Sequence, residues 1–235
     1  QIGTVNFINN ENELFIFTKR SKTMSRLTIK NVTIGEGVSK IIVPLVGLTE
    51  EQIMREAAVV KELKPDAIEW RVDIYEKVED LVAVTEMIAK LRAFFAEELL
   101  LFTFRTHKEG GNKEISEAFY VELNQTAIRT KNIDLVDVEL FTGDEYVQSI
   151  LATAKENGVF VIMSNHDFFK TPGKEEIVRR LRKMQELGAD IPKIAVMPNS
   201  VADVITLLDA TNTMKIEFAD RPFITMSMGG QGVVS

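Results

Sequence analysis

The sequence predicts an α/β fold in which parallel strands alternate with helices and curl into a (β/α)8 TIM barrel. From Lys40 onward, short apolar segments alternate regularly with segments of helical periodicity, a pattern typical of a parallel sheet covered by helices. Nearly every apolar segment carries a polar or charged residue near its carboxyl end, where such barrels assemble their sites. An open doubly wound sheet is the alternative, but residues 46–49 lack the glycine-rich turn that would favour it.

The elements follow one another in a single domain, residues 24–235. Residues 1–23 are interpreted as an extension, native or added, because Met24 is a natural starting residue, and residues 27–34 alternate like a β-hairpin. Strands are predicted over residues 40–46, 67–72, 99–104, 134–140, 159–165, 192–197 and 222–227. Helices are predicted over residues 50–63, 78–96, 114–129, 143–156, 174–187 and 200–213.

Capping residues mark the ends of several predicted helices. Three pairs have the spacing of a capping box at a helix start: Thr49 with Gln52, Thr142 with Glu145, and Ser200 with Asp203. Gly158 and Gly188 lie where two of the helices are expected to end, because glycine adopts the left-handed conformation of a C-cap easily.

Composition and charge exclude several classes of protein. The chain has 235 residues, 45% hydrophobic and 27% charged, which suits one large domain or at most two. A formal charge of −7 argues against nucleic-acid binding, and no apolar stretch approaches the roughly 18–20 residues that cross a bilayer. There is no cysteine, and the two histidines, His107 and His166, lie far apart, so no metal site is expected. We therefore expect a soluble cytoplasmic protein without nucleic-acid or membrane partners.

An amine and an imidazole stand in two neighbouring apolar runs. Lys193 is the only charged residue of residues 191–198, and His166 follows the run 159–165. A buried ammonium without a partner is costly, so such a lysine tends to lose its proton and become a nucleophile. The pair predicts imine chemistry at the lysine with a proton shuttle at the histidine. For the lysine alone, a side chain that extends from a strand end into solvent is the simpler alternative.

Other charged residues fall at corresponding places in the strands. Glu69 and Arg71 share one face of the second strand, and Arg105 ends the third. Taken singly, the first two are more simply a structural ion pair, and Arg105 is more simply exposed. Asp137 and Glu139 share a face late in the fourth strand and are expected only to orient their neighbours. Convergence on one end of a barrel favours the functional interpretation.

The loop after the third strand is expected to be ordinary. His107 lies between two polar residues and is expected to be solvated, and residues 109–111 are interpreted first as a flexible turn.

Six groups of residues occur in order along the chain: EWRVD (69–73), FTFR with EGG (102–105 and 109–111), DVEL (137–140), MSNHDF (163–168), IPKIAVMP (191–198) and ITMSM (224–228). Their order and spacing from about Thr28 to Ser235 resemble the type I 3-dehydroquinate dehydratases of the shikimate pathway. The resemblance implies a (β/α)8 barrel, usually a homodimer, whose bottom is closed by an N-terminal hairpin.

The resemblance also implies roles for individual residues. Lys193 matches a lysine that forms a Schiff base with the C3 ketone of 3-dehydroquinate. His166 matches the general acid/base, and Glu109 matches a catalytic glutamate near it. Five positions match residues that bind the substrate's hydroxyls or surround its ring: Glu69, Arg71, Arg105, Met226 and Met228. Because an iminium is itself an electron sink, neither a metal nor an organic cofactor is expected.

Two other functions stay open at this point. A class I aldolase or transaldolase also places a Schiff-base lysine in a barrel strand, and residues 229–232 could then serve as a phosphate loop. The other alternative is a catalytically silent barrel that serves as a binding partner.

The resembling family also carries residues beyond the position that matches Ser235. They include an arginine that grips the substrate carboxylate, and then an eighth strand and helix. We therefore expect the natural protein to continue past Ser235 and the eighth strand and helix to be missing from residues 1–235. The chain as printed is expected to bind dehydroquinate poorly and to turn it over slowly or not at all. As an alternative, residues 13–17 fill the gap as a substitute strand.

Overall fold

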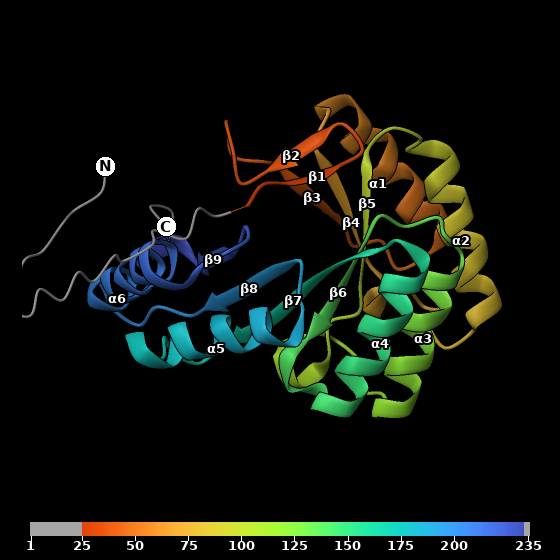
Figure 1. Ribbon diagram of the computed structural model, residues 1–235. Coiled ribbons are helices and arrows are strands. Elements are labelled where there is room, and N and C mark those ends of the chain that lie inside the picture. The colour runs from red at the N-terminus through yellow and green to blue at the C-terminus, as the bar shows by residue number, and fades with distance from the viewer. Residues whose placement is uncertain (1–24, 233–235) are drawn as a thin grey trace, which may run out of the picture.

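The computed structural model describes residues 25–232 and follows the predicted alternation of strands and helices (Figure 1). One antiparallel hairpin, β1 (Leu27–Ile29) and β2 (Val32–Ile34), precedes a parallel sheet with the order β3-β4-β5-β6-β7-β8-β9. The strands of this sheet are β3 (Ile42–Leu45), β4 (Ala67–Arg71), β5 (Leu99–Thr103), β6 (Leu135–Glu139), β7 (Phe160–Asp167), β8 (Ile191–Val196) and β9 (Ile224–Ser227).

Helices connect the successive parallel strands and cover one face of the curled sheet (Figure 1). They are α1 (Glu50–Leu63), α2 (Leu81–Phe94), α3 (Glu117–Arg129), α4 (Asp144–Asn157), α5 (Lys174–Leu187) and α6 (Val201–Thr213). Short 3-10 helices are η1 (Val72–Ile74), η2 (His107–Glu109), η3 (Leu140–Thr142) and η5 (Gly230–Gly232), and η4 (Met214–Phe218) is a π-helix. The predicted α/β class, the hairpin and the seven parallel strands are confirmed.

The edges of the parallel sheet are β3 and β9, which do not pair with each other within residues 25–232. Pro44 lies in β3, where a missing backbone N–H is tolerated because an edge strand has a neighbour on one side only. The suggested extra strand at residues 13–17 falls outside the described residues.

Helix ends follow the capping signals with one exception. Thr49 and Ser200 form the predicted capping boxes, and Gly158 and Gly188 are left-handed C-caps. The cap predicted at Thr142 is wrong: Gly143 is the N-cap of α4. The Thr142 hydroxyl instead donates to the carbonyl of residue 139, because it belongs to η3.

The helices α2 and α3 begin three residues later than predicted. Asp80 caps α2 by accepting from the backbone N–H groups of residues 82 and 83, and Ser116 caps α3 in the same way from residue 119. An N-cap side chain that satisfies the first free N–H groups sets the start of a helix more sharply than apolar periodicity does.

The two faces of the parallel sheet contribute to two apolar clusters. The larger cluster lies between the sheet and the helices and contains Trp70 and Phe102. The smaller one, at the amino ends of the strands on the other face, comprises Ile29, Val32, Ala67, Leu99, Leu101, Leu135, Ile162 and Ile191. Since Ile29 and Val32 belong to the hairpin, the hairpin covers this end of the sheet, as the family resemblance implied.

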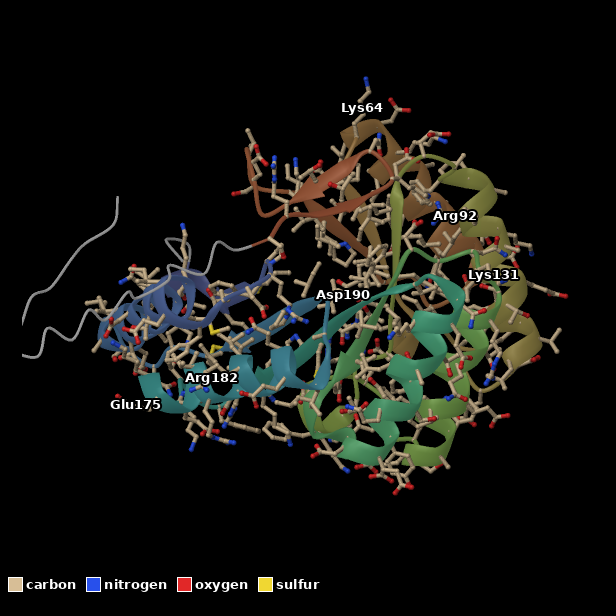
Figure 2. The ribbon with its side chains drawn as sticks, viewed as in Figure 1. Lys64, Arg92, Lys131, Glu175, Arg182 and Asp190 are labelled. Carbon is tan, nitrogen blue, oxygen red and sulfur yellow. The ribbon has the colours of Figure 1, made fainter. Side chains whose placement is uncertain are left out.

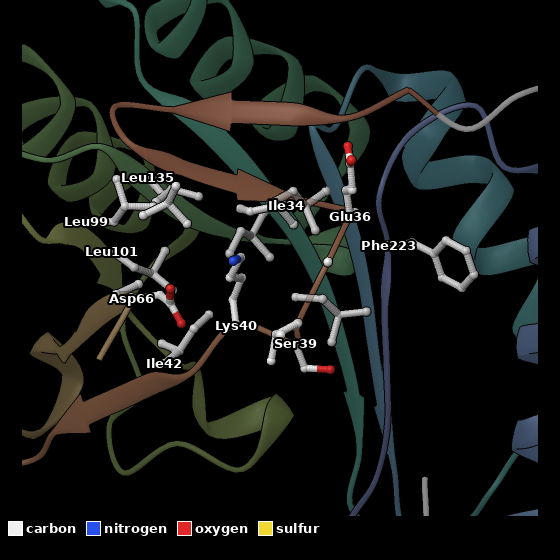
Figure 3. A pocket seen from close by; sticks show the side chains of 18 of the residues that line it. Ile34, Glu36, Ser39, Lys40, Ile42, Asp66, Leu99, Leu101, Leu135 and Phe223 are labelled. Carbon is white, nitrogen blue, oxygen red and sulfur yellow. The ribbon is translucent and has the colours of Figure 1, made fainter. Parts of the chain in front are cut away.

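A cavity of about 680 Å³ lies beside the smaller cluster (Figure 3). It is lined by Leu99, Leu101 and Leu135 from the sheet and by both edge strands, through Ile42 and Ile224. Its lining combines these aliphatic side chains with Glu36, Lys40 and Asp66, and it lies at the amino ends of the strands, opposite the end that carries Arg105 and Lys193. Among residues 25–232, no helix is long and apolar enough to cross a membrane.

Candidate active site

One face of the sheet changes from apolar to polar along the strands. Side chains alternate between the faces of a strand, so residues two apart share a face. The step occurs on four adjacent strands: Leu101 to Thr103 on β5, Leu135 to Asp137 on β6, Ile162 to Ser164 on β7, and Ile191 to Lys193 on β8. Because parallel strands end together, these polar residues meet at the carboxyl end of the sheet.

Arg105 is the centre of this polar end. Its side chain is only 4% exposed, so the simple alternative of a solvent-exposed strand end is wrong. The Nη2 atom lies 2.9 Å from Asp137 Oδ1, and Nη1 lies 2.8 Å from Glu139 Oε1 and 3.0 Å from Ser164 Oγ. Asp137 and Glu139 therefore orient the neighbouring guanidinium of Arg105, as predicted.

Charge and burial set the protonation of this cluster. Burial disfavours the charged guanidinium of Arg105, but three carboxylates raise its pKa above the usual range, so it stays charged. Burial also raises the pKa of Asp137, yet Arg105 and Lys193 outweigh it and hold this carboxyl below its ordinary value. For Glu139, burial outweighs the attraction of Arg105 and raises the pKa.

Lys193 lies on β8 opposite Ser164 of β7. Its side chain is 15% exposed, and Nζ lies 4.0 Å from Asp137 Oδ2, so the amine stays within the site rather than extending into solvent. Asp137 Oδ2 has no hydrogen-bond partner among the described residues, which leaves it facing the amine.

His166 lies two residues after Ser164 on the same face of β7 and is paired with Glu109. Its Nδ1 is 3.0 Å from Glu109 Oε2, and the same oxygen accepts from the backbone N–H of His166 at 2.8 Å. Burial and the positive charges of Arg105 and Lys193 lower the pKa of His166 to about 2, so its imidazole is neutral. Burial and the negative charge of Glu139 raise the pKa of Glu109 to about 8.

Arg71 has a different partner from the one predicted. It does not form an ion pair with Glu69 but binds Asp73 through two hydrogen bonds, Nε to Oδ1 at 2.8 Å and Nη2 to Oδ2 at 2.9 Å. Asp73 also accepts from the backbone N–H of Arg105 at 3.2 Å. Burial lowers the pKa of Arg71, but Asp73 more than offsets this and raises it. The structural-pair interpretation of Glu69 with Arg71 is therefore wrong, and Glu69 lies half-buried on the same face.

The remaining predicted residues lie around this cluster rather than in it. Met226, on β9 beside Ala195 of β8, is 46% exposed, and Met228 is half-buried just after the strand. His107 is exposed, as expected. The chain does turn after Glu109, where Gly110 is the left-handed C-cap of η2, but the Glu109 side chain itself is buried.

Sequence reasoning assigned no role to several residues of the polar end. Ser164 lies two positions before His166 on the same face of β7, a spacing that could have revealed it, and Asp73 follows Arg71 by two positions in η1. Asn165, which donates to Glu109, lies on the opposite face from His166, and nothing in the sequence pattern points to its contact.

The model of the type I 3-dehydroquinase family matches residues 41–235, and the chain belongs to this family. The 3-dehydroquinate dehydratase of Bacillus subtilis is 60% identical over 212 residues, which cover 90% of this chain and 83% of that protein. The solved type I 3-dehydroquinate dehydratase of Clostridium difficile is 51% identical with a TM-score of 0.89, covering 90% of this chain and 84% of its own. The solved 3-dehydroquinate dehydratase of Enterococcus faecalis is 45% identical with a TM-score of 0.86, covering 88% of this chain and 87% of its own. This membership favours the dehydratase over the aldolase alternative.

Proposed function

We propose that the protein is a 3-dehydroquinate dehydratase, a hydro-lyase that converts 3-dehydroquinate to 3-dehydroshikimate and water. The observation that carries the proposal is a largely buried lysine amine, held 4.0 Å from an ionised carboxylate, in a chain of this family. The catalytically silent alternative would share the fold but not the chemistry.

Lys193 is the proposed nucleophile. Its amine adds to the C3 ketone of the substrate, and loss of water from the adduct leaves an iminium. The positive nitrogen makes the neighbouring C2–H acidic, since the electrons of the broken bond move toward it. Asp137 lies beneath the amine and stabilises the positive charge that develops there. The solved Clostridium difficile relative contains covalently modified comenic acid, which supports a covalent step in the family.

His166 is the proposed proton shuttle. A neutral imidazole can accept the proton from C2, and the resulting imidazolium can return a proton to the hydroxyl leaving C1. The water released on forming the imine is consumed when the product imine is hydrolysed, so one water is lost per turnover. Glu109, in contact with Nδ1, fixes the ring so that Nε2 is left for the substrate.

The other predicted residues are proposed to hold the substrate. Glu69 and the partly exposed Arg71 present polar groups on the interior face, and Met226 and Met228 provide apolar walls. Arg105 is proposed to act mainly through its charge, because its Nη atoms already bind two carboxylates.

Trapping the imine tests this proposal. Borohydride added with dehydroquinate should reduce an adduct on the peptide that contains residues 191–197, detected by mass spectrometry. Lys193→Arg should abolish both the adduct and the rise in conjugated-enone absorbance, because a guanidinium stays protonated and forms no imine. Lys183→Arg, at a lysine of α5 that is paired with Asp144, is the matched control and should change neither.

An adduct on another lysine would overturn the assignment. Tight binding without absorbance change or adduct would favour the silent barrel. A homodimer remains a prediction, which light scattering of the purified protein can check.

A further inference from the structure

A second layer of hydrogen bonds lies behind the pair of Glu109 and His166. Asn165 of β7 is 3% exposed, and its side chain lies on the opposite face of the strand from His166. Its Nδ2 donates to Glu109 Oε1 at 3.0 Å, while its Oδ1 accepts from Arg180 Nη1 of α5 at 2.8 Å. A continuous chain of contacts therefore runs from α5 through the sheet to the imidazole.

Arg180 determines which way the Asn165 amide points. A guanidinium can only donate, so the amide oxygen must face it and the amide NH₂ must face Glu109. Arg180 is itself held in place: its Nε donates to Glu176 at 2.7 Å, and its guanidinium lies over the ring of Phe141 at 5.4 Å.

We propose that Asn165 and Arg180 are positioning residues for the acid/base pair, which make Glu109 a hydrogen-bond acceptor and hold it against Nδ1 of His166. With Oε1 bound by Asn165 and Oε2 by the backbone N–H of His166, the carboxylate has one remaining orientation toward the ring. The imidazole then keeps its proton on Nδ1 and leaves Nε2 as the base. The catalytic part of this inference rests on the proposed dehydratase function.

The hydrogen bond that Asn165 donates affects the pKa of Glu109. The charged groups that face Glu109 are Arg105 at the end of β5, Glu139 of β6 and, when protonated, His166 of β7. Burial and Glu139 raise the pKa of Glu109, whereas Arg105 and the bond from Asn165 lower it. Removing the bond therefore raises this pKa further and shortens the pH range in which Glu109 is an acceptor.

Two substitutions at Asn165 separate donation from packing. Asn165→Leu removes both contacts, and Asn165→Asp keeps the size and the bond from Arg180 but cannot donate when ionised. Both should move the ascending limb of the kcat/KM profile to higher pH, by about one to two units, because a hydrogen bond to a buried charge is of that strength. A packing role predicts instead that Asn165→Asp follows the wild-type profile.

Neighbouring arginines on α5 provide the matched control. Arg179 and Arg180 both pair with Glu176, but only Arg180 reaches Asn165. Arg180→Leu should shift the profile in the same direction, Arg180→Lys should restore part of the shift because an ammonium also donates, and Arg179→Leu should leave the profile unchanged. Equal shifts from Arg179→Leu and Arg180→Leu would overturn the role of Arg180.

A measurement without substrate separates this proposal from the proposed function. The ¹⁵N signals of the two histidines, distinguished by His107→Ala, report the tautomer of His166 across pH. These signals should change with pH in one transition, and the midpoint pH of this transition should be higher in Asn165→Leu and Asn165→Asp than in the wild type, even if the protein turned over no dehydroquinate. An unchanged transition in both variants would refute the positioning role whatever the activity.

Discussion

The two ends of one sheet face differ in what they do for the molecule. At the amino ends of β5, β6 and β8, Leu101, Leu135 and Ile191 pack beneath the hairpin in an apolar cluster. Two residues further along the same face, Asp137 and Lys193 stand within the charged network around Arg105. The backbone is the same, so the difference shows that one two-residue step separates side chains that stabilise the fold from side chains that equip it for chemistry.

The physical costs at the two ends are opposite. Burying aliphatic groups stabilises the apolar end by roughly 25 cal/mol per Å² removed from water. Burying ions at the polar end costs desolvation energy, which is recovered only while every charge keeps its partner. Here one guanidinium serves Asp137, Glu139 and, at 3.8 Å, Glu109, so the polar end depends strongly on a single residue.

Among substitutions that keep Lys193, the largest effect is expected at the proton shuttle. His166→Ala should lower kcat by about 10²–10⁴-fold, the usual contribution of general acid/base catalysis, with little loss of stability. His107→Ala changes the other, exposed histidine and should leave kcat near the wild-type value. A larger loss of kcat in His107→Ala than in His166→Ala, measured in the same steady-state assay, would show that His166 is not the proton shuttle.

Removing the central cation should break the polar end. Arg105→Met leaves buried carboxylates unpaired and should destabilise the protein by about 3–5 kcal/mol in urea unfolding at neutral pH. Without the cation, the folded-state pKa values of these carboxyls rise above their unfolded values. The deficit should therefore shrink as the pH falls from these raised values toward the ordinary carboxyl range.

A second arginine makes this comparison sharper. Arg92 of α2 (Figure 2) pairs with Asp134 and donates to three backbone carbonyls, of residues 95, 98 and 132, away from the polar end. Arg92→Met should also lose stability but should leave KM unchanged, whereas Arg105→Met should alter both. Equal effects on KM would contradict the division between the two ends.

Shortening a buried side chain at the apolar end should affect stability alone. Leu101→Ala removes a buried side chain and should cost about 2–5 kcal/mol, toward the lower value because the residue already borders a cavity. The midpoint of urea unfolding measures this loss, and KM should not change. A raised KM in the folded variant would show that the two ends are coupled.

The smallest expected effect is a pH-dependent gain in stability from Glu109→Gln. The pKa of Glu109 is raised in the folded protein from 4.5 to about 8, so the folded state binds more protons than the unfolded state between these values. The stability of the wild type from this group is present at low pH and is lost as the pH rises. Relative to the wild type, Glu109→Gln should gain on the order of 1 kcal/mol or more between about pH 5 and about pH 8.5. A constant difference across this range would contradict the raised pKa.

The sequence alone determined the alternation of strands and helices, the hairpin, and the end of the sheet at which Lys193 and His166 meet. These features depend on local periodicity and on the rule that parallel strands end together, and both can be followed along one chain. The capping boxes at Thr49 and Ser200 are equally local, because the two partners are three residues apart.

Only the tertiary structure decided which polar groups are partners. Arg105 is buried among carboxylates from the neighbouring strand, and Asn165 reaches an arginine of α5. Each of these contacts depends on strand register, on the curl of the sheet or on the rotation of a helix against it. Those quantities are set by the packing of the whole core, since an offset of one residue in a strand would turn its side chain to the opposite face.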